Sequence, residues 1–90
     1  MSNSCKHCII TGLVQGVWYR ASTKEIADSL GVTGWVRNLG TGQVECVISG
    51  SEEQLNNMVA WLHDGPPMAE VKSVDVDDAP DENFTSFDIR

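Results

Sequence analysis

The residues between positions 12 and 20 combine types and spacing that suit an anion. Gly12 and Gly16 flank residues 13–15, and glycine tolerates the backbone angles that turn successive N–H groups toward one point. Arg20 follows near the expected start of a helix, where free amides and the helix dipole attract negative charge. Its planar guanidinium can bind two phosphate oxygens. The spacing fits neither a Walker loop nor a dinucleotide fingerprint, so an ordinary strand–helix loop remains the alternative to a phosphate-binding one.

The charge of the chain is uneven. The formal net charge is −7 over 90 residues. Residues 1–44 hold four basic and two acidic side chains, whereas residues 45–90 hold two basic and eleven acidic ones, so the halves carry +2 and −9. A chain this acidic is not expected to bind nucleic acid or an anionic membrane surface non-specifically. Any small anion must therefore be bound locally, in the first half.

Composition predicts a small globular domain. Hydrophobic residues make up 41% and charged residues 21%, which is too apolar for disorder. The length favours one domain, residues 1–90. No run approaches the 18 apolar residues of a membrane span, and residues 1–4 lack a charged-then-apolar signal. We therefore expect a cytoplasmic protein and, since no apolar patch is evident, a monomer.

The elements that position the loop follow from periodicity and turn residues. Residues 6–14 alternate as a strand. A helix is expected to begin at Ser22, whose spacing to Glu25 matches a capping box, and to end before Gly31. Further strands are expected at 34–39, 43–49, 69–77 and 84–90, with a turn at 40–42 and an acidic loop at 77–83.

The second helix and the strand after it have clear local patterns. Ser51 and Gln54 have capping-box spacing at the expected start of the helix. In strand 69–77, Val71 is out of phase with Val74 and Val76. One inserted residue, a bulge, would place all three on the same face.

The order βαββαβ with a terminal strand predicts an α+β fold. Hairpin pairing and right-handed crossovers favour a ferredoxin-like sandwich: a mostly antiparallel sheet, two helices on one face, and a short extra C-terminal strand. Strands 6–14 and 43–49 would lie at its centre. Cys8 and Cys46 would then both face the helices, either as two buried reduced thiols or as a cross-strand disulfide.

Two segments resemble the signatures of the acylphosphatase family. Residues 12–20, GLVQGVWYR, resemble G-x-V-Q-G-V-x-(F/Y)-R, and residues 34–45, GWVRNLGTGQVE, resemble G-(F/Y/W)-(A/V)-x-N-x-x-(D/N)-G-x-V-E. The closing residues 87–90, FDIR, are also similar, so the resemblance spans nearly the whole chain. The chain departs at Thr41, where the family has Asp or Asn, and at Trp18, which could alter access at the mouth of the loop.

The resemblance implies hydrolysis of the carboxyl–phosphate bond of small acyl phosphates to a carboxylate and inorganic phosphate, without a metal or other cofactor. It implies that Arg20 and the backbone amides of the loop hold the phosphoryl group and that Asn38 orients the attacking water. The amides concerned are those of Gln15, Gly16, Val17, Trp18, Tyr19 and Arg20. Phosphoryl transfer depends on positioning and charge stabilisation. An asparagine is too weak a base to take the proton of the attacking water. Because an acyl phosphate has a good leaving group, a strong base is not needed, and a substrate oxygen could accept that proton.

Two other functions are carried as alternatives. Residues 5–8, CKHC, have the C-x-x-C spacing with which small ferredoxin-like domains bind soft metals. A binding-only domain could sense a phosphorylated ligand with the same loop.

His7 and His63 are expected away from the loop, the first exposed on a strand and the second near a helix C-terminus. Trp35 and Trp61 are expected to be packing residues.

Overall fold

The computed structural model describes residues 3–90, and their elements follow the expected order. The expectation that residues 1–4 form no targeting signal rests partly on residues 1 and 2, which lie outside the described residues. The elements are β1 (Ser4–Leu13), α1 (Tyr19–Leu30), β2 (Thr33–Asn38), β3 (Val44–Gly50), α2 (Glu52–Asp64), β4 (Glu70–Asp78) and β5 (Phe87–Ile89). Neither helix of this described part is long and apolar enough to cross a membrane.

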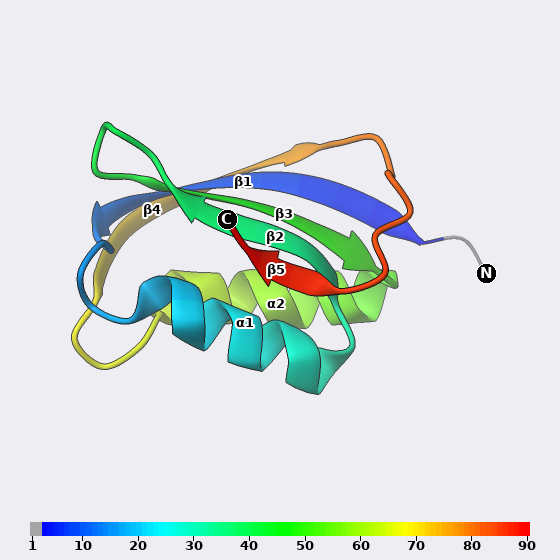
Figure 1. Cartoon of the computed structure of the whole chain (residues 1–90), viewed down its shortest axis with the longest axis horizontal. Helices are drawn as coiled ribbons and strands as arrows, with labels where there is room; N and C mark the ends of the chain where they lie inside the picture. Colours follow the sequence, from blue (N-terminus) through cyan, green and yellow to red (C-terminus); the bar gives the residue numbers. More distant parts are fainter. Residues whose placement is uncertain (1–2) are drawn as a thin grey trace.

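The strands form one sheet in the order β4-β1-β3-β2-β5. β1 is antiparallel to both β4 and β3, β2 is antiparallel to β3, and β5 is parallel to β2. Both helices cover the same face of the sheet (Figure 1). The expected ferredoxin-like α+β sandwich is confirmed, with β1 and β3 as inner neighbours.

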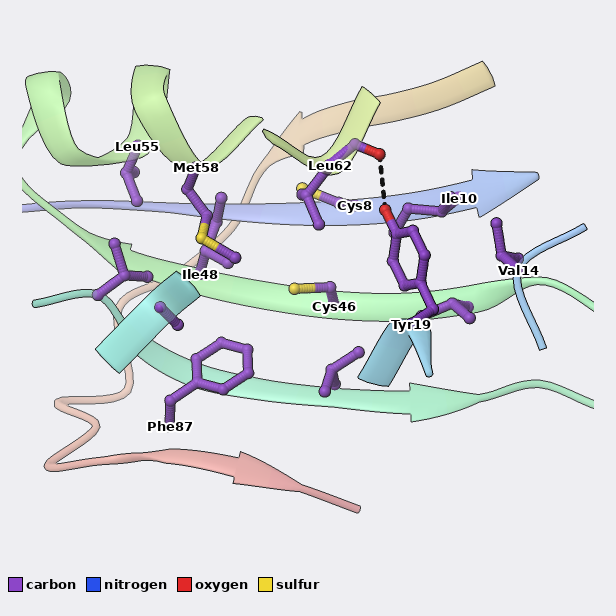
Figure 2. Packing of buried hydrophobic residues seen from close by; sticks show 14 of the residues in the cluster. Cys8, Ile10, Val14, Tyr19, Cys46, Ile48, Leu55, Met58, Leu62 and Phe87 are labelled. Atoms are coloured by element: carbon purple, nitrogen blue, oxygen red, sulfur yellow. Dashed lines mark hydrogen bonds between the residues drawn. The ribbon is translucent and has the colours of Figure 1, made fainter. Parts of the chain in front are cut away.

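The apolar core lies between the sheet and the helices (Figure 2). Its members alternate along β1 and β3 and recur at helical spacing along α2, as the sequence predicts. They include Cys8, Ile10, Val44, Cys46 and Ile48 from the sheet and Leu55, Met58 and Leu62 from α2. Phe87 of β5 closes one edge of the core.

Helix α1 begins at Tyr19, so the expected start at Ser22 is wrong. The Ser22 amide donates to the Trp18 carbonyl oxygen at 3.0 Å, which places Ser22 inside the first turn and rules out the expected capping box with Glu25. Trp18 occupies the N-cap in a left-handed conformation, and its side chain caps nothing. The buried side chain of Tyr19 anchors the helix start instead. At the other end, Gly31 adopts the expected left-handed C-cap, with φ 77°.

Helix α2 begins as predicted. The Gln54 amide donates to Ser51 Oγ at 3.2 Å, and the Ser51 amide donates to Gln54 Oε1 at 2.8 Å, which completes the capping box. Gln54 Nε2 also donates to the Leu30 carbonyl oxygen at 2.9 Å. This bond satisfies a free carbonyl at the end of α1 and joins the two helices.

Strand β4 contains the expected bulge. The register of β4 on β1 shifts between Thr11 and Gly12, so Lys72 is the additional residue. Val71 and Val74 consequently both pack against the core, whereas Val76, near the end of the strand, is 38% exposed.

Strand β5 is shorter than the expected strand 84–90. Residues 84–86 are not strand but end an irregular path, in which Asn83 has a positive φ of 55°. The Gly34 amide donates to the Ser86 carbonyl oxygen at 3.0 Å and fixes the end of this path. Regular pairing with β2 therefore begins only at Phe87.

Candidate active site

Residues 14–18 form the loop between β1 and α1 and lie at the same end of the sheet as the β2–β3 hairpin (Figure 1). Val14 and Val17 are buried and hold this loop on the core, whereas Gly16 and Trp18 are exposed. Gly16 has φ 75° and Trp18 has φ 67°. Left-handed residues of this kind turn successive amides toward one concave surface.

The backbone amides of residues 15–20 have no hydrogen-bond acceptor in the part of the chain that the structure describes. The first intrahelical hydrogen bond of α1 is donated by Ser22, so the amides before it have no helix acceptor. Within residues 3–90, no backbone hydrogen bond of a loop or turn takes its donor from positions 15–20. The positive end of the α1 dipole lies at the same place. Such a run of neutral donors suits a phosphate group.

Tyr19 fixes the start of α1, and with it the position of Arg20. Its hydroxyl donates to the Leu62 carbonyl oxygen at 2.7 Å (Figure 2). Its ring lies 5.6 Å from the Trp61 ring, centroid to centroid, so Trp61 is the packing residue that the sequence predicts. Burial raises the pKa of the Tyr19 phenol far above its usual value. Tyr19 therefore remains a neutral donor that anchors the helix.

Gln15 links the loop to the β2–β3 hairpin. Its side-chain Nε2 donates to the carbonyl oxygens of Leu39 and Gln43, at 2.8 Å and 2.9 Å. The Leu39 amide closes the hairpin by donating to the same Gln43 carbonyl oxygen at 2.8 Å. The sequence indicates a role only for the backbone amide of Gln15. The bonds of its side chain to the hairpin could not be inferred from the spacing of residues in the loop.

Asn38 ends β2 beside this hairpin. Its Oδ1 is buried and accepts no hydrogen bond from residues 3–90. A buried acceptor without a donor costs about 1–3 kcal/mol, so the position favours a ligand or water that brings a hydrogen.

A cavity of about 400 Å³ lies between the loop and the end of β2. Its lining is formed by Val14, Gly16, Trp18, Tyr19, Arg20, Ala21, Asn38 and Ile89. Arg20 and Asn38 are thus brought to one cavity. Gln15 and Val17, whose backbone amides the sequence analysis also names, do not line this cavity, so their contact with a phosphate stays a prediction. Ile89 was missed by sequence reasoning, although it lies in the closing segment that resembles the family.

The cavity has a local positive charge on an acidic chain. Of the described residues that line it, Arg20 is the one with a charged side chain. The ion pairs among residues 3–90 involve other basic groups and not Arg20. Its guanidinium is therefore available to an anion in the cavity.

The open face of the sheet, away from the helices, holds a different polar cluster. His7 is half-buried rather than exposed, and its Nε2 lies 2.8 Å from Glu45 Oε2. The hydrogen bond from His7, with a smaller contribution from Arg37, holds the pKa of Glu45 below its usual value. The guanidinium groups of Arg37 and Arg90 lie 5.3 Å and 4.9 Å from the Trp35 ring, so Trp35 packs beneath them. Alternation along the strands places this cluster on the face opposite the core.

The cysteines do not form the metal site that their spacing permits. Cys5 and Cys8 are three positions apart in β1, so their side chains point to opposite faces of the sheet. Cys8 lies directly opposite Cys46 in the β1–β3 register, and both are buried free thiols. The structure therefore has Cys8 and Cys46 as two buried reduced thiols and not as a cross-strand disulfide. His63 is exposed in the last turn of α2, as expected.

The fold and the cavity together define a class: a small ferredoxin-like domain with a cationic, amide-rich cavity at a helix N-terminus. The acylphosphatase family model matches residues 6–89. The acylphosphatase of Acaryochloris marina is 47% identical over 85 residues, which cover 94% of this chain and 91% of that protein. The acylphosphatase of Methylococcus capsulatus is 49% identical over 82 residues, covering 90% and 89%. The chain belongs to the acylphosphatase family.

Structural similarity agrees with this assignment. The solved structure of an acylphosphatase from Coxiella burnetii matches with a TM-score of 0.94 at 38% identity, covering 98% of this chain and 93% of that one. The resemblance of the two sequence motifs is thereby confirmed. Neither the soft-metal module nor the binding-only sensor is favoured by these comparisons.

Proposed function

We propose that this chain is an acylphosphatase that hydrolyses the carboxyl–phosphate bond of small acyl phosphates and releases a carboxylate and inorganic phosphate. The observation that carries the proposal is that Arg20 and Asn38 line one cavity beside a loop whose amides have no acceptor among residues 3–90. A cation, neutral donors and a water-binding amide are thus directed to one small volume. Their combination is what a metal-free phosphoryl transfer requires.

The phosphoryl group binds to the loop. The Arg20 guanidinium binds two of its oxygens in a bidentate contact, and the backbone amides donate to the remaining lone pairs. The donors are the amides of Gln15, Gly16, Val17, Trp18, Tyr19 and Arg20. Because these groups are already in place, they stabilise the charge that develops on the phosphoryl oxygens without reorganising during the reaction.

The attacking water is oriented by Asn38. Its buried Oδ1 accepts one hydrogen of the water, which directs a lone pair of the water oxygen toward phosphorus. An amide does not remove the proton. The carboxylate is a good leaving group, so the proton passes to a phosphoryl oxygen of the substrate. Holding water and phosphorus in this arrangement supplies most of the catalysis.

The proposal also covers the domain organisation, oligomeric state, partners and location of the enzyme. Residues 1–90 act as one domain and as a monomer, since Arg20, Asn38 and the loop all belong to a single sheet-and-helix unit. The acidic background of the chain disfavours nucleic acid as a partner. We place the enzyme in the cytoplasm.

The test is phosphate release from acetyl phosphate, benzoyl phosphate and 4-nitrophenyl phosphate, each with and without EDTA. We expect the purified protein to hydrolyse both acyl phosphates, to leave the phosphate monoester unchanged, and to keep its activity with EDTA. Hydrolysis of the monoester alone, or loss of activity with EDTA, would overturn the mechanism. Binding of inorganic phosphate without any turnover would show a phosphate sensor instead.

A further inference from the structure

Cys8 and Cys46 are a pair of thiols that the proposed mechanism does not use. They lie directly opposite each other in the β1–β3 register, and both are fully buried free cysteines. Figure 2 shows the two side chains on neighbouring strands, with their sulfur atoms pointing the same way within the core. Neither of them lines the cavity that holds Arg20 and Asn38. We call this pair the core dithiol.

The backbone holds the core dithiol at a spacing that suits a disulfide. The Ala79 amide donates to the Cys5 carbonyl oxygen at 3.0 Å, so the backbone groups of Cys5 point toward β4. These groups alternate in direction along a strand, so those of Cys8, three positions later, point toward β3. Cys8 and Cys46 are therefore a hydrogen-bonded pair, in which the Cα atoms are about 5.5 Å apart. Disulfides join residues whose Cα atoms are about 4.4–6.8 Å apart, so the strands need not separate to accommodate the bond.

Cys5 is outside this arrangement. Its side chain points to the face of the sheet opposite that of Cys8, and its partner in the β1–β3 register is Ser49. The three cysteines of the sequence could form three different pairs. The folded chain brings together the cysteines of one pair, the core dithiol.

We propose that the core dithiol is a redox-controlled cross-link: a small-molecule disulfide such as oxidised glutathione converts it to a Cys8–Cys46 disulfide, which holds β1 to β3 and stabilises the folded chain. One thiolate attacks a sulfur of oxidised glutathione and releases one glutathione. The other thiolate attacks the protein sulfur of this mixed disulfide and releases the second glutathione. Two electrons pass from the protein to the oxidant, and the two thiol protons end on the two glutathione molecules.

The exchange takes place when β1 and β3 separate, and folding selects the product. Burial raises the pKa of Cys8 to about 12, so the closed core contains almost no reactive thiolate. In the open chain any two of the cysteines can react. Refolding then favours the disulfide whose cysteines the register places opposite each other. By linkage, that disulfide stabilises the folded chain, because it restricts the open chain across residues 9–45.

The experiment measures the effective concentration of the core dithiol, which is the ratio of disulfide to dithiol at equilibrium with known concentrations of reduced and oxidised glutathione. It is measured in native buffer and in concentrated urea, from both the reduced and the oxidised protein. Free thiols are alkylated, and tryptic peptides are identified by mass. Cleavage after Lys6, Arg20 and Arg37 places the three cysteines on separate peptides, so each possible pair has its own mass.

We expect the effective concentration of the Cys8–Cys46 pair to be about 100-fold higher in native buffer than in urea. The unfolding equilibrium constant from urea titration should fall by the same factor on oxidation. Cys5→Ser retains the core dithiol and should behave as the wild type does. Cys8→Ala is the matched control, because it also retains two thiols, Cys5 and Cys46, but these lie on opposite faces of the sheet. It should form no more disulfide in native buffer than in urea.

Two outcomes would overturn the proposal. The first is an effective concentration of the Cys8–Cys46 pair in native buffer that is equal to or below the value in urea, since the register would then not favour the bond. The second is a wild-type peptide map in which Cys5 is linked to Cys8 or Cys46 in the main native product. Both outcomes are measured on the wild type, so they do not depend on how well Cys8→Ala folds. Neither uses acyl phosphate hydrolysis, so the proposed function is tested separately.

Discussion

The side-chain Nε2 of Gln15 donates to the Leu39 carbonyl oxygen at 2.8 Å, and this contact joins the two halves of the proposed active site. Gln15 belongs to the loop that would bind phosphate, and Leu39 directly follows Asn38, which would orient water. A second bond from the same nitrogen reaches the Gln43 carbonyl oxygen at 2.9 Å. In the proposed mechanism, the distance between phosphate and water would therefore be set partly by one glutamine side chain.

Replacing Gln15 with Leu should reduce kcat more than it raises KM. The loop amides that bind phosphate remain, but the hairpin that holds Asn38 loses its link to them. A displacement of this kind costs about 10- to 100-fold in rate. Steady-state kinetics with acetyl phosphate measure the effect. The matched control is Gln43→Ala, which removes the contact of that side chain with Thr11 but keeps the backbone carbonyl that Gln15 uses. Equal losses in both variants would contradict a positioning role.

Arg20→Ala and Asn38→Ala should each remove most of the turnover. Loss of a contact that stabilises the transition state costs about 3–4 kcal/mol, or about 10² to 10³ in kcat/KM. We expect Arg20→Ala to raise the inhibition constant of inorganic phosphate strongly, and Asn38→Ala to change it little. Arg37→Ala is the matched control, since Arg37 adjoins Asn38 in β2 but contacts Glu45 on the open face. Near-normal hydrolysis by either site variant would remove that residue from the mechanism.

The same Asn38→Ala variant should be no less stable than the wild type. The Asn38 Oδ1 is buried without a donor from residues 3–90, so its removal relieves a desolvation cost that offsets the lost packing. Urea unfolding of the variant and of Arg37→Ala gives the comparison. A large destabilisation would show that the asparagine supports the fold and would weaken its assignment to catalysis.

Much of the fold could be predicted because its determinants are local. Alternation along β1 and β3, the Ser51–Gln54 capping box and the phase shift of Val71 each depend on residues within a few positions. The start of α1 could not be predicted in this way. Ser22 has a good cap pattern, but the burial of Tyr19 against α2 is a long-range interaction and decides where the helix begins.

The functional site also has some determinants that are local in sequence and others that are long-range. Arg20 and Asn38 lie in the two segments that resemble the family signatures, and the role of Asn38 is implied by that resemblance and not by spacing. The Gln15 contact with the hairpin, and the place of Ile89 in the cavity wall, depend on how distant elements meet. β5 pairs with β2 in parallel, and this pairing alone brings Ile89 near Asn38. Periodicity within one segment contains no information on that pairing.

Substitution by alanine should destabilise the protein more at Gly12 than at Gly16. At Gly12, φ is 137° and a Cβ would collide with the backbone of Glu70 in β4. We expect Gly12→Ala to lower the free energy of unfolding by about 3 kcal/mol or more, from backbone strain and overpacking together. Gly16 has φ 75° with open space around it, so Gly16→Ala should cost about 1 kcal/mol. Urea unfolding checks both values, and equal losses would contradict the distinction.

Glu45 should make the stability depend on pH in the acid range. The hydrogen bond from His7 and the nearby Arg37 lower the pKa of Glu45 in the folded chain, relative to its ordinary value of 4.5. The stabilisation is therefore complete above that ordinary value and is lost as the pH falls through the lower folded-state value. We expect Glu45→Gln to be less stable than the wild type by about 1 kcal/mol at pH 7, and the difference to vanish near pH 2. Glu25→Gln, on the exposed side of α1, is the control, and a difference independent of pH would contradict the assignment.

The three cysteines should resist thiol reagents until the chain unfolds. Cys8 and Cys46 are fully buried, and Cys5 is 5% exposed. Burial raises the pKa of Cys8 to about 12 and that of Cys46 well above its ordinary value, so the reactive thiolate of Cys8 is about one part in ten thousand at pH 8. Labelling with a thiol-specific reagent, followed by mass measurement, should therefore give no modification in the native protein and three modifications in urea. The native rate should rise with urea in step with global unfolding, because opening of β1 from β3 breaks the centre of the sheet. Rapid modification of Cys8 or Cys46 in the native protein would contradict the burial of this pair, and rapid modification of Cys5 alone would contradict the prediction for Cys5 and show that the end of β1 opens by itself.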